Sequence, residues 1–132
     1  MKSSSSTCIT KSGTNYSVDE SGFLLRNGEF ITDDNGSNVL YLGFIEMSRF
    51  GFHGYLRVHD VFVYPLNCIK RYIDKNNKVK ILGISEKKLK ELFDELNVNS
   101  IEKVYQALHK QNPVQEFPYS FMTSLVVSFE EK

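Results

Sequence analysis

The chain has 132 residues, 41% of them hydrophobic and 24% charged, a composition typical of one globular domain that can build its own core. Its 16 basic and 16 acidic residues cancel, so the overall charge gives no attraction to nucleic acid or to an anionic membrane surface. Two cysteines, Cys8 and Cys68, are too few for a disulfide framework, and we expect both to be free thiols in a reducing compartment.

The N-terminal segment is rich in Ser and offers nothing to bury, so residues 1–7 are predicted to be a disordered leader. They contain no apolar run that could act as a secretory signal. The longest apolar run, residues 39–45, is far shorter than the about 20 residues that a membrane helix needs. We therefore expect a cytoplasmic protein that does not enter a membrane, with a single domain over residues 8–132.

The first half of this domain carries patterns typical of strands. Asn27-Gly28 separates two short apolar runs and predicts a tight hairpin, because both central residues of such a turn need positive φ. A second, longer turn is expected over residues 33–38. The nearly unbroken apolar run from Val39 to Met47 predicts a central strand covered on both faces. Tyr55 to Tyr64 predicts another strand, rich in β-branched and aromatic residues.

Helical patterns follow. Pro65 suits the first turn of a helix, and apolar residues at helical spacing extend this prediction over residues 65–75. Residues 78–82 then alternate charged and apolar side chains, a pattern typical of a half-exposed strand.

Two further helices are predicted near the C-terminal end. Ser85 is expected to cap a helix over residues 86–96. Asn99 is expected to start the next helix, with Glu102 in the position that completes a capping box. A final run of alternating residues, 121–129, predicts a closing strand.

The order of these elements predicts the fold class. Strands dominate the first half, helices the second, and one strand returns at the end. This segregation favours an α+β fold over repeated βαβ units. The simplest arrangement is a mainly antiparallel sheet with about three helices packed on one face.

No motif for a cofactor or a metal ion is present. The glycines do not form a phosphate-binding loop. His53, His59 and Asp60 are the only cluster of metal-ligating residue types, and adjacent residues of a predicted strand point to opposite faces. We therefore expect no metal site and no cofactor.

A catalytic site would need a nucleophile close to a base. The sequence lacks the nucleophile elbow G-x-S-x-G, and Cys68 lies beside Ile69 as if at the edge of a core. The expectation is that the chain is not an enzyme. A small enzyme built on a Cys68–His59 dyad stays open as an alternative, because proximity in space is invisible in a sequence.

Nucleic-acid binding is the second alternative. The segment 70–90 has a strong excess of basic residues: Lys70, Arg71, Lys75, Lys78, Lys80, Lys87, Lys88 and Lys90. Such a segment could contact phosphates in a nucleic-acid-binding or regulatory domain. Against this, the predicted elements spread these side chains in several directions, and no helix-turn-helix or RNA-recognition motif is present.

A resemblance favours a third interpretation. The size of the chain, the short hairpin Leu24-Leu25-Arg26-Asn27-Gly28-Glu29-Phe30 and the late helix pair resemble the small immunity proteins of bacterial polymorphic toxin systems, such as those of contact-dependent growth inhibition. The resemblance implies a protein-binding module that binds a cognate toxin domain in the cytoplasm and blocks its active site or its substrate path.

Candidate residues for such binding follow from what interfaces need, a central aromatic anchor and a charged rim. The anchor candidates lie on a Gly-flanked connection and are Phe50, Phe52, His53 and Tyr55. The rim candidates lie on the polar side of the helix predicted over residues 86–96 and are Glu91, Asp94 and Glu95, which could face a basic partner.

Overall fold

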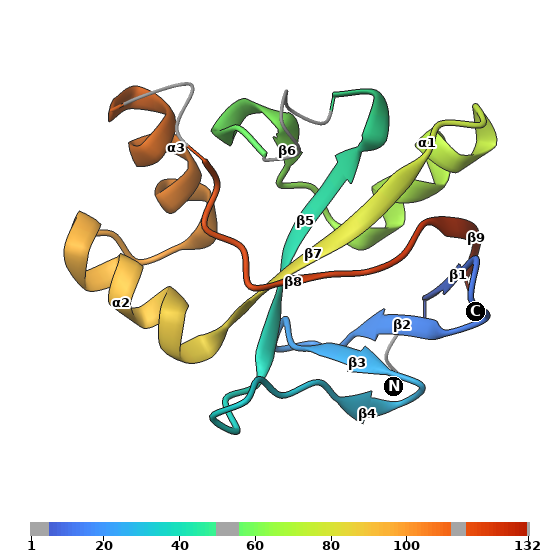
Figure 1. Ribbon diagram of the computed structural model, residues 1–132, viewed down its shortest axis with the longest axis horizontal. Helices are drawn as coiled ribbons and strands as arrows, with labels where there is room; N and C mark the ends of the chain where they lie inside the picture. The colour runs from blue at the N-terminus through green and yellow to red at the C-terminus, as the bar shows by residue number, and fades with distance from the viewer. Residues whose placement is uncertain (1–5, 50–55, 112–115, 132) are drawn as a thin grey trace.

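The computed structural model describes residues 6–49, 56–111 and 116–131, which form one antiparallel sheet with three α-helices (Figure 1). Its strands are β1 (Thr7–Thr10), β2 (Asn15–Val18), β3 (Leu24–Arg26), β4 (Glu29–Phe30), β5 (Val39–Glu46), β6 (Val61–Phe62), β7 (Val79–Ser85), β8 (Phe121–Met122) and β9 (Val126–Glu130). The helices are α1 (Ile69–Asp74), α2 (Glu86–Leu96) and α3 (Ile101–Gln111). The strand order is β4-β3-β2-β1-β9-β7-β5-β6, with β8 beside β7. The predicted α+β class with a mainly antiparallel sheet is confirmed.

Both predicted turns of the first half are present. Asn27 and Gly28 have φ of 52° and 85° and connect β3 to β4, as the hairpin motif requires. In the second turn the Asp33 carboxylate accepts hydrogen bonds of 2.9 Å from the main-chain N–H groups of Ser37 and Asn35. These bonds, the one from Ser37 foremost, hold the pKa of Asp33 below its usual value.

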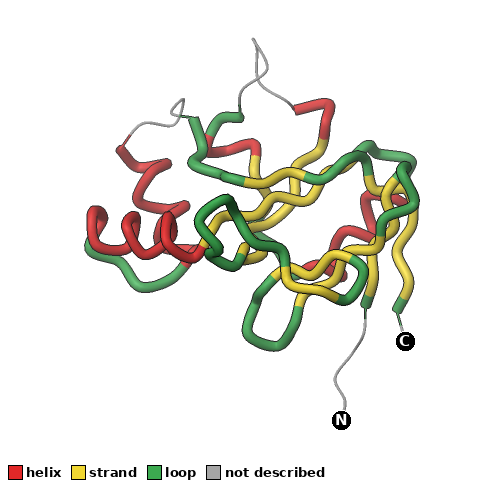
Figure 2. Tube along the Cα trace, turned by 60° about the horizontal axis from the view of Figure 1, so that its bottom comes forward, coloured by secondary structure: helices red, strands yellow, loops and turns green. Residues whose placement is uncertain are grey.

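The sheet curls back on itself between β3 and β5. Phe23, just before β3, forms an isolated antiparallel bridge with Leu40 of β5. The Tyr41 N–H donates a hydrogen bond of 2.8 Å to the Gly22 carbonyl, and the Val39 N–H one of 2.9 Å to the Ile31 carbonyl. Figure 2 shows the strands curving around in this way. One side of the sheet therefore becomes an interior.

A bulge in β5 assigns its side chains to two separate cores. The register between β5 and β7 shifts between Tyr41 and Gly43. The extra residue leaves Phe44 on the same side as Tyr41, whereas Leu42 and Ile45 lie on the other side. Each strand of this pair is therefore covered on both faces, as predicted for residues 39–47.

The helices are divided between these two cores, so the expectation that they pack on one face is wrong in this detail. The first core joins α1 to the curled side of the sheet and contains Cys8, Tyr16, Leu24, Ile31, Val39, Phe44, Leu66, Ile69, Val79, Ile81 and Val126. The second core joins α2 and α3 to the opposite side and contains Leu42, Ile45, Leu56, Val58, Val61, Leu82, Ile84, Leu89, Val104, Leu108 and Phe117. Figure 1 shows α2 and α3 on the left of β5 and β7, and α1 on the right.

The most buried strand is β7, not β5. β7 pairs with β5 on one side and with β8 and β9 on the other. β5 pairs with β7 on one side, but on its other side it has only the two-residue edge strand β6. The prediction of a half-exposed strand for residues 78–82 is wrong, because a hydrophobic core covers each face of β7 and buries its apolar residues. Lys78 is exposed and precedes the strand, and Lys80 is only partly buried within it.

Two other boundaries differ from the predictions. β1 begins at Thr7, inside the predicted leader, and residues 1–5 lie outside the described residues. Within Tyr55 to Tyr64 only Val61–Phe62 is a strand, preceded by the 3-10 helix Val58–Asp60, and Tyr55 is not described.

The helix and strand ends near the C-terminus also differ in detail. Ser85 caps α2 as predicted, since its Oγ accepts the Lys88 N–H at 3.3 Å. In α3 the cap is Ser100 and not Asn99, since the Ser100 Oγ accepts the Lys103 N–H at 3.2 Å. The closing strand is split into β8 and β9, and Thr123 lies between them.

None of the helices in the described residues combines the length and the apolar composition that crossing a membrane requires.

Candidate functional site

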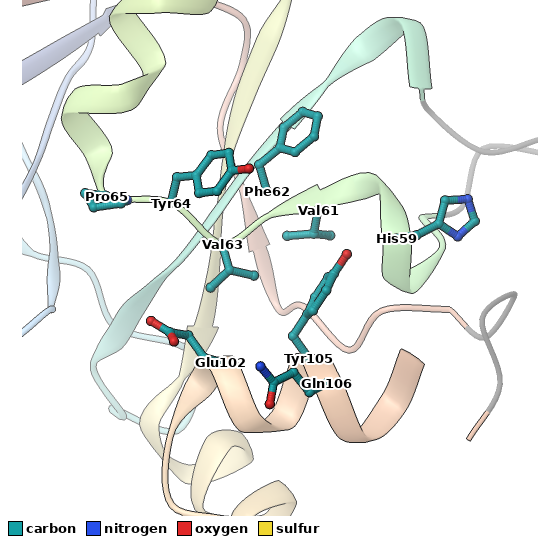
Figure 3. A pocket seen from close by; sticks show the side chains of 9 residues that line it. All are labelled: His59, Val61, Phe62, Val63, Tyr64, Pro65, Glu102, Tyr105 and Gln106. Carbon is teal, nitrogen blue, oxygen red and sulfur yellow. The ribbon is translucent and has the colours of Figure 1, made fainter. Parts of the chain in front are cut away.

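A groove separates the β6 edge of the sheet from α3 (Figure 3). Its larger part has a volume of about 630 Å³ and is lined by His59, Val61, Phe62, Val63, Tyr64, Pro65, Glu102, Tyr105 and Gln106. A smaller adjoining part of about 270 Å³ shares Val63, Tyr64, Pro65 and Glu102 and adds Tyr41, Leu42, Ser100 and Ile101. We call these two parts together the β6–α3 groove. Their combined size is within the range of pockets that bind ligands.

Side chains alternate along the β6 side of the groove. Figure 3 shows Val61 and Val63 pointing toward α3, whereas Phe62 and Tyr64 point the other way. The Phe62 and Tyr64 rings stack with centroids 6.0 Å apart and planes 5° apart. Phe62 also stacks on Tyr72 of α1 at 5.3 Å, which anchors this aromatic row to the first core. Tyr64 at the end of the row remains 49% exposed.

The main chain of this segment has a defined orientation. The Tyr41 hydroxyl donates a hydrogen bond to the Tyr64 carbonyl, so that carbonyl points toward β5. A Cβ atom on Gly43 of β5 would lie 2.5 Å from the Phe62 oxygen, so this carbonyl points the same way. Successive groups of an extended chain alternate, so the N–H and C=O groups of Val61 and Val63 point away from β5. No strand of the described residues pairs with that outer side.

The opposite wall belongs to α3. Glu102, Tyr105 and Gln106 face the groove from one side of this helix. The Tyr105 ring stacks parallel to His109 with centroids 6.2 Å apart, and its centroid lies 6.0 Å from that of Phe117 in the second core. Burial, and then the negative charge of Asp60, raise the pKa of Tyr105. Tyr105 therefore presents a neutral hydroxyl to the groove.

His59 and Asp60 lie at one end of the groove and do not point apart, contrary to the prediction from a strand. They belong to a 3-10 helix, and His59 Nε2 lies 3.5 Å from Asp60 Oδ1. Asp60 is only 5% exposed, and its Oδ2 accepts the Arg57 N–H at 3.2 Å. The Asp60 carboxylate therefore closes the turn.

The described residues bring together no set of catalytic or metal-binding groups. No group of three or more His, Cys, Asp or Glu among them is placed to hold a metal ion. Within the described lining of the larger part of the groove there is no Ser, Thr or Cys to act as a nucleophile. Ser100, in the smaller part, already caps α3.

The two cysteines lie away from the groove. Cys68 lines a separate pocket with Asn67, Lys70, Arg71 and Asp74, whereas His59 lines the groove, so the geometry does not support a Cys68–His59 dyad. Cys8 is 0% exposed in β1 of the first core, and burial raises the pKa of its thiol to about 12.

Of the residues predicted to bind a partner, the structure describes only the rim candidates. The anchor candidates Phe50, Phe52, His53 and Tyr55 lie outside the described residues. The rim candidates Glu91, Asp94 and Glu95 are all exposed on α2, and none of them lines the groove.

The basic residues of the segment 70–90 are also dispersed. Lys70 and Arg71 lie on α1, on the side of the first core, whereas Lys87, Lys88 and Lys90 lie on α2, on the side of the second core. Because the sheet separates these helices, they do not form one continuous basic surface for nucleic acid.

Sequence reasoning missed the groove, although one pattern pointed to it. Pro65 follows a run of β-branched and aromatic residues, and Pro at the end of such a run is typical of an edge strand. An edge strand next to a helix is where a groove can form.

Comparison of the chain with protein-family models, curated proteins and solved structures finds no match.

Proposed function

We propose that this chain is a protein-binding module whose partner docks in the β6–α3 groove, and that it acts as an immunity protein which neutralises a cognate toxin domain in the cytoplasm. The observation that supports binding is the groove itself. It combines main-chain groups that have no strand partner among the described residues with aromatic and aliphatic side chains on both walls. Interfaces favour such aromatic surface, because a ring adds large contact area at little cost in conformational entropy.

The polar groups around the groove support binding over catalysis. Asp60 closes a turn, Ser100 caps a helix and the Tyr41 hydroxyl bonds to a main-chain carbonyl. Each of them serves the fold, and the polar side chains that remain toward the groove are His59, Tyr64, Glu102, Tyr105 and Gln106. The immunity role itself is supported by the resemblance in size, hairpin and helix pair.

The test is neutralisation of a toxin in a living cell. A candidate toxin domain, sought among the genes beside the one for this chain, is expressed in a bacterial host with and without the chain, and growth is measured. The proposal expects growth to be restored and a stoichiometric complex to elute in size-exclusion chromatography. Unchanged toxicity in the presence of soluble, folded chain would refute the immunity role.

A further inference from the structure

We propose that the β6–α3 groove takes an extended segment of a partner protein, which adds as an antiparallel strand beside Val61 and Val63 and places a Lys or Arg side chain against Glu102. This inference rests on the proposed protein-binding function and goes further, because it states the binding mode and the chemistry of the segment.

The first argument is the main chain. Val61 and Val63 direct their N–H and C=O groups away from β5, and Val63 makes no main-chain hydrogen bond within the described residues. Two residues in this register offer four hydrogen-bonding groups to an antiparallel neighbour. Residues 61–65 all line the groove and span about 16 Å if fully extended, enough to meet about five residues of a partner strand. Strand addition of this kind supplies affinity through the main chain.

The second argument is the arrangement of side chains around that edge. An added strand alternates its side chains, as β6 does. On one side they would meet Val61, Val63 and the ring of Tyr105, and on the other the stacked row that ends in Tyr64. Both sides favour apolar side chains in the partner segment.

The third argument is charge. Glu102 lines both parts of the groove, and no Lys or Arg is among their described lining residues. The Glu102 carboxylate is exposed and makes no hydrogen bond or ion pair within the described residues. A basic side chain beside Glu102 would gain an ion pair and would lie near the ring of Tyr105, which attracts cations.

The same charge argues against a second copy of this chain as the occupant. Antiparallel pairing of two β6 edges would be symmetric and would bring the same groups of both copies together. Each copy would contribute Glu102 to the shared groove, with no cation from either described lining. A basic segment of another protein is therefore the better complement.

The test starts from a displayed library of random dodecapeptides, selected on the immobilised full chain. The inference expects selected peptides to alternate apolar residues around a Lys or Arg. N-methylation of each main-chain nitrogen in one selected peptide should then weaken binding at every second position. A helical peptide, or one bound by side chains alone, would show no such period of two, and this result would overturn strand addition.

A charge reversal tests the role of Glu102. Glu102→Lys should weaken binding of the selected basic peptide about tenfold or more, and selection on this variant should favour acidic peptides. The matched control is Glu20→Lys, which reverses an exposed charge in the turn between β2 and β3, outside the groove, and should leave the affinity unchanged. Equal effects of the two variants, selected peptides without a basic residue, or a dimer formed by the chain alone through this edge would each overturn the inference.

The two proposals can fail separately. If the toxin is not neutralised but the peptides bind with the expected pattern, the immunity role fails and the binding mode stands. If the toxin is neutralised equally well by the wild-type chain and by Glu102→Lys, and N-methylation shows no period of two, the immunity role stands and the binding mode fails.

Discussion

The hydroxyl of Tyr41, on β5, donates a hydrogen bond to the main-chain carbonyl of Tyr64, beyond the end of β6. This bond holds Tyr64, in the segment that lines the groove, to the sheet. At this position the segment has no strand pairing with β5. We expect Tyr41→Phe to lower the free energy of unfolding by about 0.5–1.5 kcal/mol, the usual net worth of one hydrogen bond. Urea denaturation measures this loss.

Tyr72→Phe is the control for this variant, because the Tyr72 ring packs in the same aromatic cluster and its hydroxyl has no hydrogen bond within the described residues. Its stability should stay close to that of the wild type. Equal losses for both variants would mean that the Tyr41 bond adds nothing specific.

Gly43 is expected to tolerate no side chain. Its φ is 150°, and a Cβ atom would lie 2.5 Å from the Phe62 oxygen. Gly43→Ala should therefore destabilise the protein by at least about 2 kcal/mol, through backbone strain and through a clash that pushes β6 away from β5. Gly36→Ala is the comparison, since Gly36 also has positive φ (78°) but open space around it. Thermal denaturation should show the larger loss for Gly43→Ala, and equal losses would contradict the close approach.

Thr123 supports the most buried strand at the point where β8 ends. Its Oγ1 accepts the Ile81 N–H at 3.0 Å and donates to the Ser124 carbonyl at 2.8 Å. Thr123→Val keeps the shape but leaves the Ile81 N–H without an acceptor, which should cost about 1–3 kcal/mol. Thr123→Ser keeps the hydroxyl and loses one methyl group. A valine variant as stable as the serine variant in urea would show that the hydroxyl is not needed.

Cys8 makes stability depend on pH in the alkaline range. Burial raises the pKa of its thiol from 9.0 to about 12, so between these values the folded state keeps a proton that the unfolded state has lost. The contribution of Cys8 is therefore fully present below pH 9 and is lost as the pH rises toward 12. At pH 10 the loss should reach about 1.4 kcal/mol, one pK unit of linkage.

Cys8→Ala provides the comparison for this effect. Its unfolding free energy should fall less between pH 8 and pH 10 than that of the wild type, whatever its absolute stability. The pKa of Tyr41 is raised mainly by burial, which both proteins share, whereas the smaller part that comes from the charge of Cys8 is lost in the variant together with the thiol. Parallel pH profiles would show that the Cys8 thiol ionises equally well in the folded and unfolded states.

Elements encoded by local patterns were predicted well. The hairpin at Asn27-Gly28 follows from the positive φ of two adjacent residues, and α2 follows from its apolar stripe and the Ser85 cap. Both depend on residues close in sequence, so a single sequence contains the information.

Elements that depend on distant partners were predicted poorly. β1 is a strand because it pairs with β9, more than a hundred residues away, and that pairing buries Cys8. The same reason explains why most of the described residues 56–64 do not form a strand, since only Val61 and Phe62 pair with β5. The groove was missed for this reason too, because it is formed by β6 and α3, which no local pattern relates.

The fold's two cores share the paired strands β5 and β7. β7 sends Val79 and Ile81 into the first core and Leu82 and Ile84 into the second. Displacing β7 to open one core would expose the other core to solvent at the same time. The protein should therefore melt in a single step, with the main-chain amides of β7 the last to exchange their hydrogens with solvent.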